Sequence, residues 1–240
     1  EGRLSVVELA TGAVETFGSF DALPAGLACE VLPGIGINNS ASVSDGAVIG
    51  GNSTDRALMT FLNDAGTAVR ISKENVVSFE AFDSAKKYSN VVLKGKDGNV
   101  MFVKGAPEKI VSRCTRYLTA EGESKPFADT AALTEYFNVQ ASRSMRLLSV
   151  ARVEGGTENG EWTLVCVLAI RDNVRTEAVT AIKDVRSAGI QVVMVTGDRK
   201  ETAMAIAREA GLLTEPSDVV WTSAELGEMS DDEVKAALPS

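Results

Sequence analysis

Alternation of apolar and polar positions dominates the first two thirds of the chain. The strands predicted from this pattern cover residues 4–9, 13–17, 147–153 and 162–170, and a β-hairpin covers residues 86–105. Asp97-Gly98 supplies the positive φ angles that the hairpin turn needs. The stretch 154–161, "EGGTENGE", reads as a flexible link between the last two strands. These patterns predict a mainly antiparallel sheet.

Helical periodicity alternates with these strands. The predicted helices cover residues 27–32, 50–66, 106–118 and 130–143. In the second helix Ser53 or Thr54 is the expected cap, and Ala57, Leu58, Phe61 and Leu62 form its buried stripe. Residues 34–46, "GIGINNSASVSDG", are predicted to be a loop of small residues. Helices therefore flank the predicted sheet.

The pattern changes at Arg171. A helix with an apolar face ends at Gly189, a strand follows over Ile190–Val195, and a second helix leads to the apolar patch Val219–Trp221. This β-α-β-α-β order is typical of a parallel sheet. We therefore predict two domains: an α+β domain over residues 1–170 and a partial α/β, Rossmann-like segment over residues 171–240.

Composition narrows the classes of function. The chain has 240 residues and a net charge of −9, which argues against a broad nucleic-acid interface. It contains no histidine, so a histidine-based triad or a histidine-ligated metal is excluded. Its three cysteines show neither metal-ligand spacing nor a disulfide framework, which fits a reducing, cytosolic setting, and no metal-binding residue is predicted. No apolar run approaches the ~20 residues that span a bilayer, and no signal peptide is visible.

The stretch "VMVTGDRKETAMAIAREAGLL" places Thr196 and Gly197 at the carboxyl end of the predicted parallel strand, where open sheets bind ligands. Asp198 can cap the next helix, and Glu201 completes a capping box. The helix start would then present N–H groups to an anion. Two interpretations are open from these residues alone: a phosphate-facing element, or a plain capped turn.

This stretch resembles the phosphorylation-domain segment that follows the hinge in P-type ion-pumping ATPases. The resemblance implies that Thr196 contacts the transferred phosphate, with Gly197 and Asp198 close to it. Four further stretches resemble the nucleotide-binding domain of the same family and occur in the family's order between about residues 51 and 214.

Two of these stretches carry lysines. In "FDSAKKYS" the resemblance implies that Phe82 stacks on adenine and that Lys87 lines the nucleotide pocket. In "KGAPE" it implies that the nucleotide lies against Gly105, with Lys104 beside it. From the residues alone, Phe82 is also open to interpretation as a core residue beside solvated lysines, and Pro107 as the start of a helix.

The other two stretches carry an acid and an arginine. In "GGNSTDRAL" Asp55 stands where the family usually has a Glu that binds the adenine amino group, and its shorter side chain leaves a helix-cap role open. In "SMRLLSVA" the resemblance implies that Arg146 bridges the nucleotide phosphates and that Leu148 lies under the ribose. A solvated arginine at a strand start is the alternative.

The hinge departs from the family pattern Asp-Pro-Pro-Arg. Asp172 and Arg175 are kept, whereas Asn173 and Val174 replace both prolines. Because proline fixes φ, this hinge is expected to be looser.

The combination of motifs resembles the calcium-pump-like branch, of bacterial type. The family's nucleophilic "DKTGT" and its magnesium-binding "GDGxNDxP" are absent from the sequence. We therefore expect a catalytically inactive ATP-binding fragment from the cytoplasmic side of an integral plasma-membrane pump, soluble by itself and not contacting the membrane. Its partners would be ATP and the other domains of the pump, with Mg²⁺ held mostly outside this chain.

Two other classes remain open. A haloacid-dehalogenase-type phosphatase shares the parallel sheet but needs an Asp-x-Asp nucleophile that this chain lacks. A non-catalytic interaction module is compatible with the acidic surface.

Overall fold

The computed structural model describes residues 3–68, 71–143, 145–197, 200–215 and 218–237, and these divide into two compact units. One unit contains Arg3–Ala141 and Met145–Asp172, and the second is built mainly from Asn173–Ser240. The strand that was predicted to end at Ile170 continues through Asn173, so it crosses the predicted domain boundary between residues 170 and 171.

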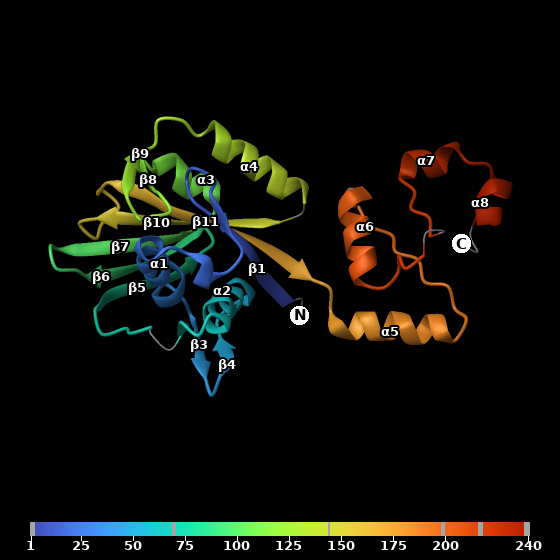
Figure 1. Ribbon diagram of the computed structural model, residues 1–240, viewed down its shortest axis with the longest axis horizontal. Coiled ribbons are helices and arrows are strands. Elements are labelled where there is room, and N and C mark those ends of the chain that lie inside the picture. Colours follow the sequence, from blue (N-terminus) through green and yellow to red (C-terminus); the bar gives the residue numbers. More distant parts are fainter. Residues whose placement is uncertain (1–2, 69–70, 144, 198–199, 216–217, 238–240) are drawn as a thin grey trace. The chain divides into compact units, whose positions relative to one another are not determined.

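A mostly antiparallel sheet forms the larger unit (Figure 1). Its order is β2-β1-β11-β10-β7-β6-β5, with β8 pairing β11 in parallel and β9 pairing β8. Its strands are β1 (Arg3–Ala10), β2 (Thr16–Phe17), β5 (Val76–Asp83), β6 (Tyr88–Lys94), β7 (Asn99–Gly105), β8 (Arg116–Leu118), β9 (Ser124–Pro126), β10 (Arg146–Glu154) and β11 (Trp162–Asn173). The predicted antiparallel α+β architecture of this unit is confirmed.

Helices cover both faces of this sheet, and alternation along the central strand β11 supplies the two apolar surfaces beneath them. Leu168 packs in one core with side chains of α1 and α2, whereas its neighbour Val167 packs in another with side chains of α3 and α4. The helical segments of this unit are η1 (Phe20–Ala22), α1 (Ala25–Leu32), the π-helical turn η2 (Pro33–Ile37), α2 (Ser53–Asp64), α3 (Pro107–Ile110), η4 (Val111–Arg113) and α4 (Ala131–Ser142).

Some predicted elements have different bounds. The predicted loop at residues 34–46 contains most of η2 and the start of a separate hairpin, β3 (Ala41–Ser44) with β4 (Ala47–Gly50). Asp45 and Gly46 form its two-residue turn, both with positive φ as this turn type requires. The predicted helix 106–118 is wrong beyond Arg113, because Arg116–Leu118 pairs with β11 as a strand. The exposed edge strand β5 was not predicted.

Helix α2 begins one residue earlier than the predicted caps allow. Asn52 is the N-cap, and its Oδ1 accepts a hydrogen bond of 2.9 Å from the backbone N–H of Asp55. The predicted buried stripe of Ala57, Leu58, Phe61 and Leu62 is confirmed. The helix thus presents its apolar side to the sheet and its capped N-terminus to the site described below.

Asn52→Ala is expected to destabilise the larger unit by about 1 kcal/mol, because it removes the acceptor for a first-turn N–H group. Urea unfolding measures the change. Ser53→Ala is the matched control, since Ser53 is not the cap. Equal losses in the two variants would contradict the assignment.

The second unit is helical in its described part, with α5 (Thr176–Ser187), α6 (Lys200–Glu209), α7 (Ser223–Glu228) and α8 (Asp231–Ala237). The predicted strand at Ile190–Val195 is wrong: the stretch is irregular, and Val195 is 91% exposed. Residues 219–221 are irregular as well. A strand exists only by pairing with a neighbour, and neither stretch pairs with the other. The Rossmann-like sheet therefore does not form within the described residues of this unit.

Candidate functional site

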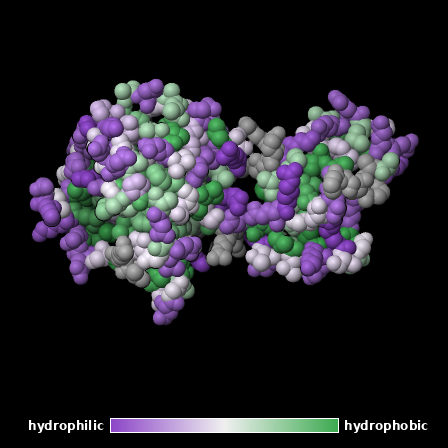
Figure 2. Space-filling view, viewed as in Figure 1, coloured by the Kyte–Doolittle hydropathy of each residue, from purple (hydrophilic) through white to green (hydrophobic). Residues whose placement is uncertain are grey.

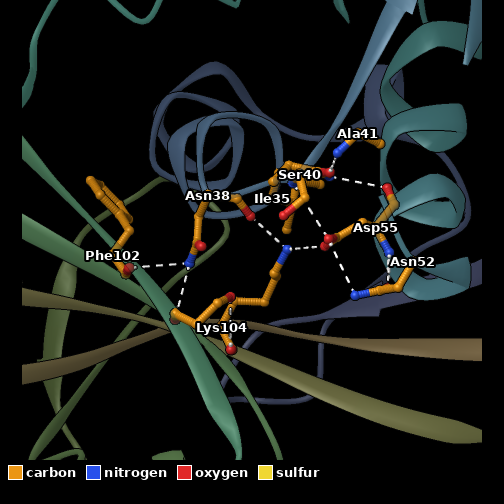
Figure 3. Close-up of polar contacts among 10 residues, drawn as sticks. Ile35, Asn38, Ser40, Ala41, Asn52, Asp55, Phe102 and Lys104 are labelled. Carbon is orange, nitrogen blue, oxygen red and sulfur yellow. Dashed lines mark hydrogen bonds and ion pairs between the residues drawn. The ribbon is translucent and has the colours of Figure 1, made fainter. Parts of the chain in front are cut away.

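A buried ion pair lies between the sheet and helix α2 (Figure 3). Lys104 Nζ on β7 is 2.7 Å from Asp55 Oδ1, and the two side chains are only 5% and 8% exposed. The same ammonium group donates a hydrogen bond of 2.5 Å to the backbone carbonyl of Asn38, just after η2. Three chain segments, which are distant in sequence, therefore meet at one charged group.

The carboxylate of Asp55 is fixed from its other side as well. Its Oδ2 accepts weaker hydrogen bonds from the backbone N–H of Ser40, at 3.4 Å, and from Asn52 Nδ2, at 3.3 Å. The carbonyl of Asp55 accepts another from Asn39 Nδ2, at 3.1 Å. Both carboxylate oxygens therefore have donors, which is what a buried charge requires.

Burial disfavours the charged form of Lys104 and lowers the pKa of its ammonium group, while the adjacent Asp55 carboxylate raises that pKa and opposes the burial effect. A buried pair of this kind adds little net stability compared with apolar residues, but loss of one partner leaves an uncompensated buried charge. The pair therefore fixes the position of β7 relative to α2 more than it stabilises the fold.

Asn38 was missed by sequence reasoning, although it is fully buried at the centre of this arrangement. Its Nδ2 donates to the carbonyls of Ser89 and Phe102, each at 3.2 Å, so it bridges β6 and β7. Its Oδ1 is buried with no hydrogen-bond partner among the described residues. Two adjacent asparagines, Asn38 and Asn39, in a stretch of small residues were the available signal.

Phe82 and Lys87 flank the turn between β5 and β6. The turn is closed by the backbone N–H of Lys87, which donates a hydrogen bond of 2.7 Å to the carbonyl of Asp83. Asp83 Oδ1 also accepts from the N–H groups of Ala85 and Lys86, at 2.7 and 2.9 Å. Lys87 has a φ of 67°, and Phe82 is 54% exposed. The turn thus holds an aromatic ring at the surface beside two lysines.

Gly105 lies against this turn. A Cβ atom at Gly105 would stand 2.3 Å from the carbonyl oxygen of Lys87 and 2.6 Å from the Cβ of Tyr88. The same Lys87 carbonyl accepts a hydrogen bond of 3.1 Å from the N–H of Ala106. Gly105 is therefore required for the close approach of β6 and β7 at this point.

Arg146 and Leu148 lie on the same face of the sheet as Lys104. Val150 pairs directly with Lys104 in the register of β10 and β7, and residues at intervals of two along β10 share that face. Leu148 is half-buried against the core beneath α1 and α2. Arg146 is 65% exposed, and its guanidinium lies 4.0 Å from the carboxylate of Asp172 on β11.

The residues predicted for the hinge and for the phosphate-facing segment lie outside the Lys104–Asp55 site. Asp172 is near the end of β11, and Arg175 occupies the N-cap position of α5 with no side-chain cap hydrogen bond. Thr196 and Gly197 are exposed in an irregular segment of the second unit, and Asp198 lies outside the described residues. Among the predicted site residues, the structure therefore brings two pairs into contact: Asp55 with Lys104, and Lys87 with Gly105.

No group of three or more Asp, Glu or Cys side chains in the described ranges is arranged to hold a metal ion. In the same part of the chain, no helix combines the length and the apolar character needed to cross a bilayer.

The fold and this site together define an α+β domain whose antiparallel sheet carries a buried lysine–aspartate pair and, on its edge strand β5, an exposed phenylalanine. The family model of the P-type ATPase cytoplasmic domain N matches residues 34–177, more than half of the chain. The chain therefore belongs to the P-type ATPase cytoplasmic domain N family.

The chain is also similar in sequence to individual calcium-transporting ATPases. Calcium-transporting ATPase 4, plasma membrane-type, of Arabidopsis thaliana is 30% identical over 200 residues, which cover 79% of this chain and 19% of the relative. Calcium-transporting ATPase 10, plasma membrane-type, of rice (Oryza sativa subsp. japonica) is 33% identical over 203 residues, 79% of this chain and 20% of the relative. Plasma membrane calcium-transporting ATPase 1 of Mus musculus is 36% identical over 185 residues, which cover 68% of this chain and 15% of the relative. The chain spans about a fifth of the length of the curated relatives it matches.

Proposed function

We propose that this chain is the nucleotide-binding portion of a calcium-transporting P-type ATPase, which presents ATP for phosphoryl transfer to an aspartate elsewhere in the parent pump. One observation carries the proposal beyond family membership. The register places Lys104, Leu148 and Arg146 on one face of adjacent strands, and Asp55 reaches Lys104 from α2 on that face. ATP and the other pump domains are the partners in this proposal.

Each residue has a role that its surroundings support. The exposed ring of Phe82 stacks on adenine, while Lys87 and the free face of the Arg146 guanidinium supply positive charge to the phosphates. Leu148 lies under the ribose. The nucleotide lies against the backbone of Gly105, where the lack of a side chain lets the turn that carries Lys87 approach β7 closely. Figure 2 shows apolar side chains at the surface around the edge strand β5, whose Phe82 is 54% exposed.

For Asp55 we propose a role other than direct contact with adenine. Its carboxylate already pairs with Lys104 and accepts two further hydrogen bonds. We assign Asp55 to holding the Lys104 ammonium group in place. A direct bond from Asp55 to the adenine amino group would compete with those contacts.

The second unit contributes to the phosphorylation domain in this proposal. Residues 190–195 pair as a strand only when neighbouring strands of the parent pump are beside them, since an isolated strand leaves its backbone groups unpaired. Thr196, Gly197 and Asp198 would then face the transferred phosphate, and Asp172 and Arg175 would flank the hinge. In this proposal Mg²⁺ is held mostly by residues of the pump outside this chain.

The location of the parent follows from the same proposal. The chain would lie on the cytoplasmic side of a plasma-membrane pump, as the names of the relatives suggest. The relatives reported above come from plants and animals, so the bacterial type predicted from the sequence stays a prediction.

Titration of the chain with ATP, followed by calorimetry or NMR, tests the proposal. Phe82→Ala is expected to weaken binding by about 5- to 150-fold, because base–aromatic stacking contributes roughly 1–3 kcal/mol. Phe79→Ala is the matched control: Phe79 is an exposed phenylalanine, 41% accessible, on the same strand. Its loss should leave ATP affinity unchanged.

Several outcomes would contradict the proposal. The chain would fail to bind ATP at millimolar concentration, or the wild type and Phe82→Ala would bind ATP with equal affinity. Hydrolysis of an aryl phosphate by the chain alone would favour a phosphatase instead. An unchanged melting temperature with saturating nucleotide would favour an interaction module, since a ligand of the folded state must stabilise it.

A further inference from the structure

A polar cluster lies on the opposite face of the sheet from Lys104, around the loop that joins β10 and β11. Glu158 of this loop accepts a hydrogen bond of 2.5 Å from Tyr88 Oη at its Oε1 and one of 3.0 Å from Arg113 at its Oε2. The carbonyl of Glu158 accepts a third, of 3.0 Å, from Trp162 Nε1. The loop predicted to be a flexible link is therefore fastened at Glu158.

Aromatic rings complete the cluster. The Arg113 guanidinium lies 5.1 Å from the ring centroid of Trp162 and 5.9 Å from that of Tyr88, within the range of cation–π attraction. Tyr88 and Trp162 are only 5% and 4% exposed, whereas the Arg113 and Glu158 side chains are 44% and 43% exposed. The buried rings of Tyr88 and Trp162 therefore both contact the half-exposed Arg113–Glu158 ion pair.

Tyr88 connects this cluster to the nucleotide-site residues. It follows Lys87 directly, and it pairs with Gly105 in the register of β6 and β7. Its Cα and Cβ atoms would stand 2.7 and 2.6 Å from a Cβ atom at Gly105. Any displacement of Tyr88 therefore displaces the Lys87 carbonyl, which binds the N–H of Ala106.

We infer that Glu158 is a positioning residue for the nucleotide site: through Tyr88 it fixes the turn that carries Phe82 and Lys87 against Gly105. The inference rests on the proposed function, and it adds to the site a residue that acts from the far face of the sheet. Glu158 does not touch the nucleotide. Its effect is to limit the freedom of a turn whose backbone N–H groups donate to Asp83, within the turn itself.

Two measurements on the full chain test this role. Glu158→Gln is expected to weaken ATP binding about threefold to tenfold, because the turn loses a charge-assisted hydrogen bond that orders it. It is also expected to shift the NMR amide resonances of Lys87 and Gly105 without nucleotide. Tyr88→Phe should do the same, and the double variant should lose less affinity than the sum of the two single losses, because Glu158→Gln weakens and Tyr88→Phe removes the same hydrogen bond.

The controls separate positioning from general stability. Glu161→Gln changes a carboxylate of the same loop that, among the described residues, accepts only a hydrogen bond of 3.5 Å from Thr115, and it should leave both readouts unchanged. Leu133→Val lowers the melting temperature through the core beneath α4, and it should leave ATP affinity intact while the chain is folded.

The outcomes distinguish this inference from the proposed function. Wild-type ATP binding with unchanged affinity in Glu158→Gln overturns the positioning role alone. Absence of ATP binding in the wild type overturns the proposed function, and the Lys87 and Gly105 amide shifts then still decide whether Glu158 fixes the turn. Unshifted amides overturn the inference in either case.

Discussion

Asp55→Asn is expected to lower the free energy of unfolding of the larger unit by about 3–5 kcal/mol, because it leaves the buried Lys104 ammonium group without its counter-charge. The effect is large because Lys104 is 5% exposed and water cannot replace the carboxylate. Paired replacement by Asp55→Leu and Lys104→Met is expected to recover most of this loss, since apolar residues of similar size need no partner.

Urea unfolding followed by tryptophan fluorescence measures this difference. The buried Trp162 reports the larger unit, provided that Trp221 of the second unit is first replaced by Phe. Asp64→Asn is the matched control, because Asp64 is an exposed aspartate at the other end of α2. It should change stability by less than about 0.5 kcal/mol. A similarly small change for Asp55→Asn would show that the ion pair does not hold α2 to the sheet.

Gly105→Ala is expected to destabilise the larger unit by about 1–3 kcal/mol and to weaken ATP binding as well. The new methyl group would meet the carbonyl oxygen of Lys87 and the backbone of Tyr88, neither of which is the end of a flexible side chain. Relief of the clash requires β6 to move away from β7, which also moves the turn that carries Lys87 and Phe82.

Gly18→Ala controls for the change of residue type. A Cβ atom at Gly18 meets nothing within 4 Å, and Gly18 has no positive φ. Its replacement should therefore leave stability and affinity close to those of the wild type. Thermal unfolding gives the first quantity and ATP titration the second. If Gly105→Ala kept both the stability and the ATP affinity of the wild type, the close approach of β6 and β7 would be contradicted.

Local patterns were sufficient for much of the larger unit. The hairpin of β6 and β7 and the strands β10 and β11 appear where alternation predicted them. The apolar stripe of α2 is also buried as its spacing indicated. These elements are determined by periodicity, which depends only on neighbouring residues along the chain.

Long-range pairing explains the errors. Residues 116–118 continue a helical pattern, but they pair with β11 as a strand because that strand offers unpaired backbone groups. Residues 190–195 have strand composition, yet they pair with no strand within the described residues and stay irregular. β5 was missed although Val77, Phe79 and Ala81 alternate with Ser78 and Glu80, and its residues are mostly exposed because it lies at the edge of the sheet.

By itself, the sequence determined the class of the larger unit, the family resemblance and the residue types at the nucleotide-site positions. Only the tertiary structure decided how those residues act. It buried Lys104 against Asp55 and the Asn38 carbonyl, whereas it left Phe82 exposed at the sheet edge. It also joined Glu158, from a loop that looked flexible, to Tyr88 across 70 residues of chain. The physical reason is that burial and partnership depend on contacts between distant segments, which neither periodicity nor a short motif encodes.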